Sequence, residues 1–469
     1  MRLTKIIATI GPASESAAQI KALLEAGVNT FRLNFSHGTL EEHQARVNMI
    51  RQTAAALNRQ VGILQDLCGP KIRLGDLVNG QLNLKVGEQI VLSGKPCQGT
   101  LQKVSVSYPK LGEEVAPGEI VYIADGTVAL EVVKQEDGDI VTRVVDGGII
   151  KSHQGVNLPQ SKLSVAAVTE KDISDLKAGL KMGVDWVALS FVRHAQDIVG
   201  LRKIMEQEGT VVPIIAKLER PEALENLASI LAATDAVMVA RGDLAIETPM
   251  ERIPIWQKEI IRQARQANKV VVVATQMLES MIHEERPTRA EVADVSNAVF
   301  DGTDAVMLSG ETAVGDHPAL VVAQMAKIVV AAEKVAYVRG DNVLQAVPSD
   351  LSKAVAATAV RMAETLKAAA FVIPTDSGRS AALIARHRPG IPILALTHDA
   401  RTAAKLTLRF GVITRLVEHS EDFEQVAAIA LREIKQSKLA QEGQYVVLTA
   451  GHPLGEHGST NLIKAILVN

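Results

Sequence analysis

The sequence predicts an α/β protein: a (β/α)8 TIM barrel with a small inserted β-barrel domain and a C-terminal open-sheet α/β domain. Eight short β-branched runs alternate with amphipathic helical patterns, as in a parallel sheet covered by helices. Apolar residues make up 47% of the chain and are rich in Ala, Val, Ile and Leu. The length of 469 residues suits about three domains. A doubly wound open sheet would show the same alternation, so the pattern leaves barrel closure undecided.

The eight runs expected to form the barrel strands mostly end in a polar residue or glycine. They are Lys5–Ile10, Val28–Asn34, Val61–Asp66, Val184–Phe191, Val211–Lys217, Asp235–Ala240, Lys269–Thr275 and Asp304–Ser309. Helices are expected to stop at Gly27 and Gly183, which occupy the position of a C-terminal glycine cap. Pro221 suits a first helical turn, and Thr288 and Glu291 have the spacing of a capping box.

A stretch without helical periodicity interrupts the barrel after its third strand. Between Asp66 and Lys171, the alternating patterns GQLNLKVGEQIVL and GDIVTRVV are punctuated by glycines and indicate strands. We assign residues 1–69 and 167–340 to the barrel and residues 70–166 to an inserted all-β domain. Because the mouth loops of a barrel carry its active site, a domain inserted there would serve as a lid.

A second α/β pattern begins after a polar stretch. The segment RGDNVLQAVPSD, residues 339–350, is typical of a linker. Helical patterns over 351–367 and 381–388 then alternate with the strand-like runs FVIPT, PILALT, VITRLV and YVVLTA. We assign residues 345–469 to a C-terminal open-sheet domain.

Composition and charge exclude several classes of function. Fifty Lys and Arg against 53 Asp and Glu give a net charge of −3, so we expect neither nucleic acid nor an anionic membrane as partner. Aromatic residues are 3% of the chain, which is few for base stacking. Cys68 and Cys97 are too few for a disulfide framework or a cysteine metal site. The start lacks a signal-peptide pattern and no apolar run approaches ~18 residues, so we expect a cytoplasmic protein.

Charged and hydroxyl side chains stand at the ends of several predicted strands, which meet at one mouth in a barrel. They are Arg32, Asn34 and Ser36 on the second strand, Asp66 on the third, Lys217 and Glu219 on the fifth, Asp243 after the sixth and Thr275 on the seventh. Glu219 and Asp243 offer carboxylate oxygens for Mg²⁺, and Lys217 and Arg32 offer positive charge for a phosphoryl group or an enolate. The residues therefore predict metal-assisted phosphoryl or enolate chemistry.

Plainer interpretations of these residues remain open. Lys217 and Glu219 could form a simple salt bridge, Asp243 could cap a helix, and Thr275 could satisfy a backbone group. Two other functions also fit the pattern. One is a Mg²⁺-dependent aldolase or lyase that handles pyruvate without a nucleotide, and the other is a catalytically idle sensor of phosphorylated metabolites.

Long motifs of the chain resemble those of the pyruvate kinase family. In order from residue 4 they are TKIIATIGPAS, RLNFSHG, GPKIR, GVNLP, AKLERPEAL, VMVARGDLAIE, ATQMLESMI, RPTRAEVADVSNAV and DGTDAVMLSGET. The resemblance implies transfer of the phosphoryl group of phosphoenolpyruvate to ADP, which gives pyruvate and ATP in the last step of glycolysis. It also implies Mg²⁺ (or Mn²⁺ in its place), allosteric regulation through the C-terminal domain, and a homotetramer.

The resemblance assigns catalytic roles by position. Lys217 would stabilise the charge of the transferring phosphoryl group and of the enolate, and Arg32 would contact the phosphoryl group. Glu219 and Asp243 would bind the catalytic Mg²⁺, and Thr275 would lie on the proton path to the enolate carbon.

The resemblance also assigns the binding of both substrates. The backbone of Arg241, Gly242 and Asp243 would hold the substrate carboxylate. A second Mg²⁺ would arrive with ADP, and the nucleotide side would be lined by Asn34, Phe35, Ser36, His37 and Arg73. Gln154 stands where the family often has a nucleotide-binding Lys, and Lys151 is the nearby substitute.

One departure from the family pattern predicts activity without K⁺. Members that need K⁺ usually carry Glu at the position of Lys71 and Thr at the position of Leu67. The K⁺ would lie among Asn34, Ser36, Asp66 and the carbonyl of Leu67. The ammonium of Lys71 is a tethered cation that could place its charge near this pocket, so we expect that K⁺ is not required.

The loop after the FVIPT run predicts an anion site in the C-terminal domain. It places hydroxyls and amides at a helix start, an arrangement that suits a phosphate. Its residues are Thr375, Ser377, Gly378, Arg379 and Ser380. In the family the equivalent loop binds the phosphate of an allosteric effector, and the GHPLGEHGST segment supports such a ligand here. An ordinary capped turn is the alternative.

Overall fold

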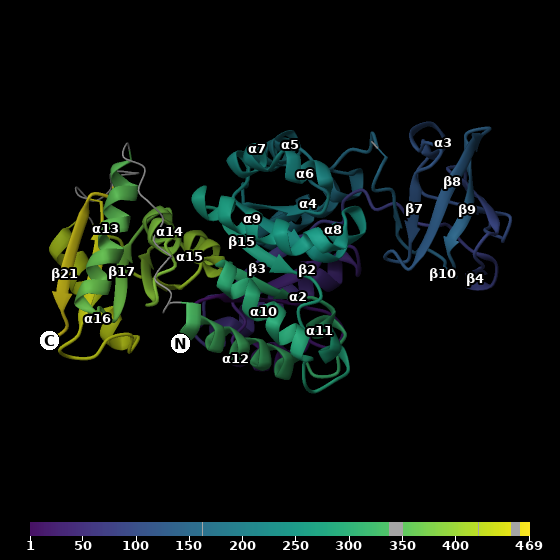
Figure 1. Cartoon of the computed structure of the whole chain (residues 1–469). Coiled ribbons are helices and arrows are strands. Elements are labelled where there is room, and N and C mark those ends of the chain that lie inside the picture. Colours follow the sequence, from purple (N-terminus) through teal and green to yellow (C-terminus); the bar gives the residue numbers. More distant parts are fainter. Residues whose placement is uncertain (162, 337–349, 421, 452–459) are drawn as a thin grey trace.

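A computed structural model describes residues 1–161, 163–336, 350–420, 422–451 and 460–469. Figure 1 shows three parts in a row, with the barrel between the inserted β domain and the C-terminal domain. The predicted linker lies outside the described residues except for Asp350, and so does the segment 452–459 of the GHPLGEHGST loop.

Eight parallel strands close into a barrel, which confirms the predicted fold class and decides against the open sheet. Around the barrel the order is β1 (Lys5–Thr9), β16 (Ala305–Leu308), β15 (Val270–Ala274), β14 (Ala236–Ala240), β13 (Ile214–Leu218), β12 (Trp186–Leu189), β3 (Gly62–Asp66) and β2 (Thr30–Asn34). The register pairs Thr9 with Arg32 and Asn34 with Asp66, so the polar ends of neighbouring strands lie at one mouth.

Helices and short turns connect the strands around the outside of the barrel. They are α1 (Ala17–Ala26), α2 (Leu40–Ala56), α4 (Glu170–Met182), α5 (Ala195–Gln207), α6 (Pro221–Glu225), α7 (Leu227–Ala233), α8 (Arg241–Glu247), η2 (Met250–Arg252), α9 (Ile253–Gln266), η3 (Glu279–Ile282), α10 (Arg289–Asp301), α11 (Gly310–Ala313) and α12 (Pro318–Ala336). The predicted glycine caps are confirmed, since Gly27 and Gly183 adopt left-handed φ angles of 116° and 80°. The predicted capping box at Thr288 and Glu291 also forms.

The interior of the barrel changes from apolar to polar toward the mouth. Alternate residues of each strand point inward, so one strand contributes to both layers. The buried middle layer includes Leu64, Ile215 and Met238. Two residues further along their strands, Asp66 and Lys217 enter the polar layer. The alternation that places apolar residues in the core therefore also directs the polar residues at the strand ends toward the interior of the mouth.

The inserted domain occupies the connection between β3 and α4. Its six-stranded sheet has the order β11 (Val156–Asn157), β7 (Ile120–Ile123), β8 (Val128–Glu136), β9 (Asp139–Asp146), β5 (Gln89–Ser93) and β6 (Lys103–Ser105). A two-stranded sheet pairs β10 (Gly148–Lys151) with β4 (Gln81–Leu84), and the short helices η1 (Val78–Gly80) and α3 (Leu111–Glu114) complete the domain. The inserted domain, predicted as a small β-barrel, thus consists of two sheets around one core. Gly147 lies close to the neighbouring strand, since a Cβ there would lie 2.6 Å from the Leu84 carbonyl oxygen.

The C-terminal domain is an open five-stranded sheet with helices. Its strand order is β19 (Val412–Leu416), β18 (Ile393–Thr397), β17 (Ala370–Pro374), β20 (Tyr445–Ala450) and β21 (Leu462–Leu467). The helices are α13 (Leu351–Leu366), α14 (Arg379–Ala385), α15 (Ala400–Lys405), η5 (Leu406–Leu408) and α16 (Phe423–Gln436). The antiparallel strand β21 is an edge strand without alternating burial, which explains why the sequence pattern did not predict it.

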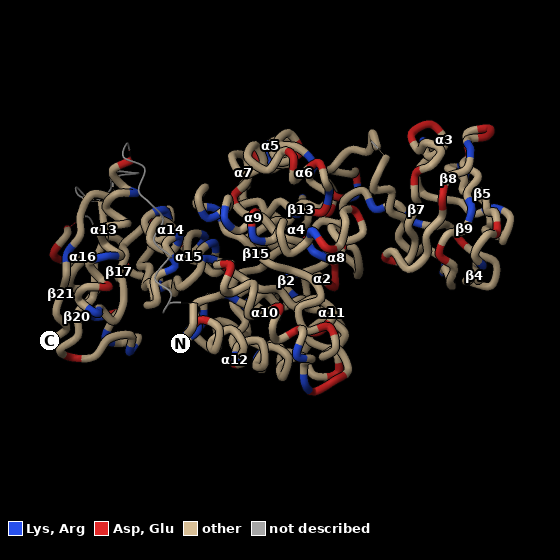
Figure 2. The backbone as a smooth tube through the Cα atoms, in the orientation of Figure 1, with Lys and Arg blue, Asp and Glu red and all other residues tan. Residues whose placement is uncertain are grey.

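The C-terminal domain closes the base of the barrel, at the end opposite the mouth. Leu408 packs into the apolar interior of the barrel, and Arg388 forms a buried ion pair with Asp304 at 2.6 Å. Figure 2 shows that basic and acidic residues are interspersed along all three parts of the backbone. Within the described ranges, no helix is long and apolar enough to cross a membrane.

Candidate active site

Lys217 is the central charge of the barrel mouth. It lies at the end of β13, with its side chain 11% exposed. Its Nζ lies 2.9 Å from Glu219 Oε1 and 3.4 Å from Asp66 Oδ1. Burial alone would lower the pKa of Lys217, but the two carboxylates outweigh it and raise the pKa above its usual range. Lys217 is therefore a permanently charged ammonium held in a dry pocket.

Asp66 connects Lys217 to Arg32 on the neighbouring strand. Arg32 Nε donates to Asp66 Oδ2 at 2.7 Å, and Arg32 Nη1 donates to Thr9 Oγ1 at 3.1 Å. Burial opposes ionisation of Asp66, yet the charges of Lys217 and Arg32 lower its pKa below the usual value. Asp66 thus stays ionised and fixes two cations side by side at the mouth.

Glu219 is the least compensated charge of the group. Its carboxylate is fully buried, and burial raises its pKa to about 7 although Lys217 opposes the shift. Phe191 N–H donates to Oε2 at 2.8 Å, whereas Oε1 is paired, among the described residues, only with the ammonium of Lys217. The cavity is lined by three carboxylates (Asp66, Glu219 and Asp243) and three cations (Arg32, Lys71 and Lys217), so its formal charges balance. The carboxylate oxygens of Glu219 and Asp243 are ligands that suit a hard divalent cation such as Mg²⁺.

Thr275 lines the same cavity, and Gly242 is hydrogen-bonded to it. Thr275 has a φ of 70°, a conformation that a β-branched residue adopts only under constraint. Its Oγ1 accepts from Gly242 N–H at 2.7 Å and donates to the Ala274 carbonyl at 2.6 Å. Arg241 turns away from the cavity, because its guanidinium binds Asp294 at 2.5 Å and the Thr275 carbonyl at 2.9 Å. Arg241 therefore offers the site its backbone while its side chain holds the loop.

The residues of the predicted K⁺ pocket line the same small cavity as Lys217. Asn34, Ser36, Asp66, Leu67 and Lys71 all border it. The Leu67 carbonyl accepts a hydrogen bond from Ser190 Oγ at 2.8 Å. The structure thus brings the tethered cation and the pocket together.

The nucleotide-side residues divide into exposed and buried members. His37 lies near Arg73, Lys71 and Arg32; burial chiefly, and then these cations, lower its pKa. Phe35 is buried and its ring stacks on His43 with centroids 4.0 Å apart, so its side chain offers no surface to a nucleotide.

Gln154, which stands where the family often has a nucleotide-binding Lys, and the nearby Lys151 have different surroundings. Gln154 Oε1 accepts from the backbone N–H of Lys151 at 2.7 Å, so this side chain closes a turn. Lys151 itself is exposed. The structure therefore gives Gln154 a local role and leaves the Lys151 side chain on the surface.

A cleft of about 830 Å³ separates the inserted domain from the barrel mouth. Tyr122, Asp125 and Gln160 line it on one side, and Asp243 and Thr275 on the other. Glu247 also lines this cleft, and Asn157 Nδ2 donates to its Oε1 at 3.0 Å. Buried Arg220 binds the other oxygen of Glu247 at 2.9 Å. The β domain thus faces Asp243 and Thr275 across an open space.

The predicted effector loop lies at the start of α14, in the C-terminal domain. Thr375 Oγ1 accepts from Gly378 N–H at 3.0 Å, so one amide of the nest is already satisfied. Ser380 Oγ lies 2.8 Å from Thr460 Oγ1, while Ser377 and Arg379 are exposed. The five predicted residues therefore come together, in a turn that is also internally capped.

Ser190 is a residue of this site that the sequence patterns above did not predict. Lys217 Nζ donates to Ser190 Oγ at 2.8 Å, which makes this hydroxyl the third partner of the central ammonium. Ser190 follows β12, the fourth barrel strand, and is buried. The rule used on the other strands, a polar residue at the carboxyl end, would have found it.

Comparison with known proteins decides among the functions left open. Residues 1–322 match the family model "Pyruvate kinase, barrel domain", and residues 353–466 match "Pyruvate kinase, alpha/beta domain". The chain belongs to the pyruvate kinase family. The resemblance predicted from the motifs is confirmed, and the aldolase or lyase and the idle sensor are ruled out. The family transfers a phosphoryl group from phosphoenolpyruvate to ADP and yields pyruvate.

Curated relatives match along the whole chain. The "Pyruvate kinase" of Geobacillus stearothermophilus is 42% identical over 100% of this chain and 81% of its own length. The "Pyruvate kinase" of Corynebacterium glutamicum is 44% identical and is covered over 98% of its length. The "Pyruvate kinase 2" of Synechocystis is also 44% identical, over 79% of its length.

Proposed function

We propose that Lys217, Arg32 and Thr275 carry out the family's phosphoryl transfer in this chain, with Glu219 and Asp243 holding Mg²⁺. The observation that supports this proposal best is the burial of Lys217 between Asp66 and Glu219, beside Arg32 and facing the cavity. Cations held in place before the reaction stabilise developing negative charge without reorganisation. Lys217 and Arg32 would act in this way on the phosphoryl group and the enolate oxygen.

Asp66 is the positioning residue of this proposal. It binds both cations through different oxygens, so neither can swing away from the cavity. Mg²⁺, when bound by Glu219 and Asp243, would supply further positive charge for substrate oxygens. Its binding would also compensate the buried Glu219 carboxylate.

Thr275 would handle the proton that reaches the enolate carbon. Its hydroxyl sits in a fixed chain of hydrogen bonds between Gly242 N–H and the Ala274 carbonyl. The first turn of α8 points its backbone amides at the cavity, where Gly242 and Asp243 would hold the substrate carboxylate. Binding of that carboxylate would compete with Thr275 for the Gly242 amide and so free the hydroxyl for proton transfer.

The inserted domain would close over ADP and exclude water. The cleft between Tyr122 and Asp243 is wide enough for a nucleotide, and small-molecule sites commonly occupy several hundred Å³. His37, Arg73 and Asn34 lie outside the lining of this cleft and would bind the phosphates from the neighbouring part of the mouth. Water exclusion matters because hydrolysis of phosphoenolpyruvate would waste its phosphoryl group.

A lactate-dehydrogenase-coupled assay tests the reaction and its metal. Pyruvate should form only when phosphoenolpyruvate, ADP and Mg²⁺ are all present, with Mn²⁺ as a substitute. The site proposal predicts that Glu219→Gln raises the Mg²⁺ concentration needed for half-maximal rate. An unchanged Mg²⁺ requirement in this variant would exclude Glu219 as a ligand.

We also propose that K⁺ is not required, because Lys71 supplies the positive charge of the predicted K⁺ pocket. Lys71 borders the cavity that Asn34, Ser36 and Asp66 also line. Initial rates in K⁺, Na⁺ and tetramethylammonium should therefore be equal. Lys71→Glu should make the rate depend on K⁺ by at least ~10-fold, since it reverses a charge beside the pocket.

Lys85→Glu is the matched control for this test. Lys85 is an exposed lysine between β4 and β5 of the same inserted domain. It undergoes the same charge reversal outside the cavity, so its variant should stay indifferent to K⁺. A wild-type protein that loses most of its rate without K⁺ would contradict the proposal.

Regulation and assembly are the last parts of the proposal. The loop of Ser377, Arg379 and Ser380 is a candidate site for the phosphate of an allosteric effector, and a homotetramer is the assembly expected from the family resemblance. Rates measured with sugar phosphates, fructose 1,6-bisphosphate and AMP, in the wild type and in Arg379→Ala, would test the first. Light scattering on the purified protein would test the second.

A further inference from the structure

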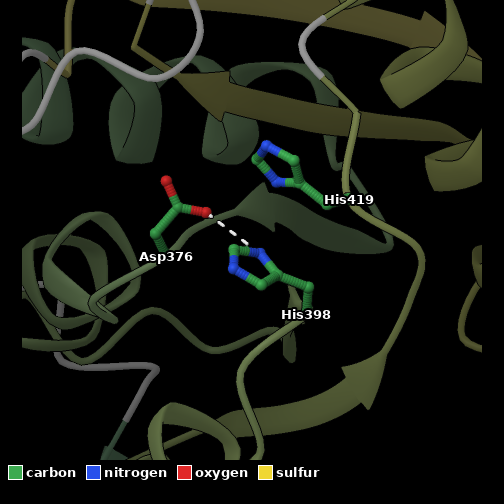
Figure 3. Close-up of side chains that lie close together, drawn as sticks. All are labelled: Asp376, His398 and His419. Atoms are coloured by element: carbon green, nitrogen blue, oxygen red, sulfur yellow. Dashed lines mark ion pairs between the residues drawn. The ribbon is translucent and has the colours of Figure 1, made fainter.

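Two histidines and an aspartate converge in the C-terminal domain, far from the barrel mouth. Asp376, His398 and His419 each offer a ligand atom, and these atoms all lie within 4.8 Å of one another. His398 Nδ1 lies 3.4 Å from Asp376 Oδ1, and the two imidazole rings have centroids 4.6 Å apart. Figure 3 shows the three side chains pointing toward a common centre.

The fold brings these residues together from three separate strands. Asp376 follows β17, His398 follows β18 and His419 follows β19. These strands are parallel and adjacent in the sheet, so the residues lie at one carboxyl edge. In open α/β sheets this edge is where ligands bind.

Two of the three loops are fixed by their own hydrogen bonds. Thr402 Oγ1 donates to the Asp376 carbonyl at 2.7 Å, which ties the loop after β17 to α15. Asp399, the neighbour of His398, caps α15 by accepting from Thr402 N–H at 3.0 Å. Asp376 and His398 are therefore held by one helix start, and the site is partly organised before any ligand arrives.

We propose that Asp376, His398 and His419 bind a divalent transition-metal ion of the Zn²⁺ class. Two imidazole nitrogens with one carboxylate suit Zn²⁺, Co²⁺ or Ni²⁺, whereas Mg²⁺ and Ca²⁺ take oxygen ligands. Donors that each lie ~2.1 Å from a tetrahedral ion are ~3.4 Å apart, which is the distance of the His398–Asp376 pair. The ligand atom of His419 lies within 4.8 Å of the other two, so a small adjustment of the three side chains completes the ligand set.

Three protein ligands leave a fourth coordination position. All three side chains are partly or well exposed, so water or an anion can take that position. Asp376 stands between Thr375 and Ser377 of the proposed effector loop. The metal site does not depend on the effector proposal, because its ligands and its test involve no phosphate.

Two other His–Asp pairs show what sets this cluster apart. His283 and Asp316 lie 3.1 Å apart, and His153 and Asp76 lie 3.0 Å apart, both on the surface. Among the described residues, neither pair belongs to a group of three ligand atoms. A single exposed pair binds metal weakly, so His283 provides a matched control.

Calorimetric titration of the full chain with ZnCl₂ tests the proposal. The titration is done in excess Mg²⁺, which occupies the oxygen-only sites, including Glu219 and Asp243 if these are ligands. Wild type should bind one Zn²⁺ per chain at this site. His398→Asn and His419→Asn should each weaken that binding by at least ~100-fold, because even loss of an outer partner of a metal ligand costs 10–100-fold.

His283→Asn should bind Zn²⁺ as tightly as wild type. Equal loss in His283→Asn and His398→Asn, or no difference between wild type and His398→Asn, would overturn the proposal. X-ray absorption of the Zn²⁺-loaded wild type gives a second reading that needs no variant. Two imidazole nitrogens in the ligand shell would support the site, and a shell of oxygens alone would refute it.

Discussion

The mouth and the base of the barrel both contain buried ion pairs, but they satisfy them differently. At the base, Asp304 accepts from Arg388, from Phe410 N–H at 3.0 Å and from Val271 N–H at 3.1 Å. At the mouth, Asp66 Oδ1 and Glu219 Oε1 are paired, among the described residues, only with the single ammonium of Lys217, at 3.4 and 2.9 Å. Asp304 thus has several donors, whereas these two oxygens share one cation.

This difference separates a structural ion pair from a reactive one. Desolvating a charge costs several kcal/mol, and only complete pairing and hydrogen bonding recover that cost. At the base, pairing within the protein recovers the desolvation cost of Asp304 and Arg388 and joins two domains. At the mouth, part of that cost is not recovered within the protein. A cation or a charged substrate therefore binds more favourably there than on an ordinary surface.

Replacing Lys217 tests the mouth and has the largest expected effect. Lys217→Met should lower kcat by at least ~10³-fold, because it removes a fixed charge beside the phosphoryl group. The unfolding temperature should also fall, because Glu219 and Asp66 lose the buried ammonium that pairs with them, so the rate is measured at a temperature where the melt shows the variant to be folded. The coupled assay and a thermal melt measure both. Lys258→Met, at an exposed ion pair, is the control, and retained turnover in Lys217→Met would refute the assigned role.

Breaking the ion pair at the base should affect stability instead of turnover. Asp304→Ala leaves Arg388 buried without its carboxylate, which should cost ~3–5 kcal/mol of unfolding free energy. The folded fraction should keep its wild-type kcat. Urea unfolding measures the loss, with Glu259→Ala at an exposed pair as a control that should change stability by ~0.5 kcal/mol. A fall in kcat as large as the one for Lys217→Met would contradict the separation of the two ends.

Acidic pH should lower the free energy of unfolding through His387, which lies at the base of the barrel. Burial, and then the charges of Arg386, Arg265 and Arg388, lower the pKa of His387 to about 4. Between its ordinary pKa of ~6.5 and about 4, the unfolded chain takes up a proton that the folded chain does not. Stability should therefore fall as the pH drops through this window, by on the order of 3 kcal/mol.

His387→Asn isolates this contribution from the other groups that titrate in the same window. Its free energy of unfolding, measured by urea at several pH values, should fall less steeply than that of wild type between pH ~6.5 and ~4. Parallel profiles for the two proteins would show that His387 does not carry the effect.

Most of the fold followed from local patterns. The segments Val61–Asp66 and Lys269–Thr275 are predicted as strands because buried parallel strands are continuous apolar runs. Strand β21 of the C-terminal domain is not predicted, since an edge strand with mixed burial shows no alternation of apolar and polar residues. Within the site, polar residues at strand ends predicted Lys217, Glu219 and Asp243, and the same rule applied to β12 would have predicted Ser190. The buried orientation of Phe35, in contrast, is visible only in three dimensions.

The sequence by itself determined the barrel units, the site's residue types and, through long motifs, the family. Periodicity and capping are local properties, and a motif is a string of residues, so both can be read along the chain. Only the tertiary structure decided that the sheet closes, that Asp66 holds two cations, and that Asp376, His398 and His419 face one another. Those facts depend on which strands become neighbours, and strand pairing brings together residues that are distant in the sequence.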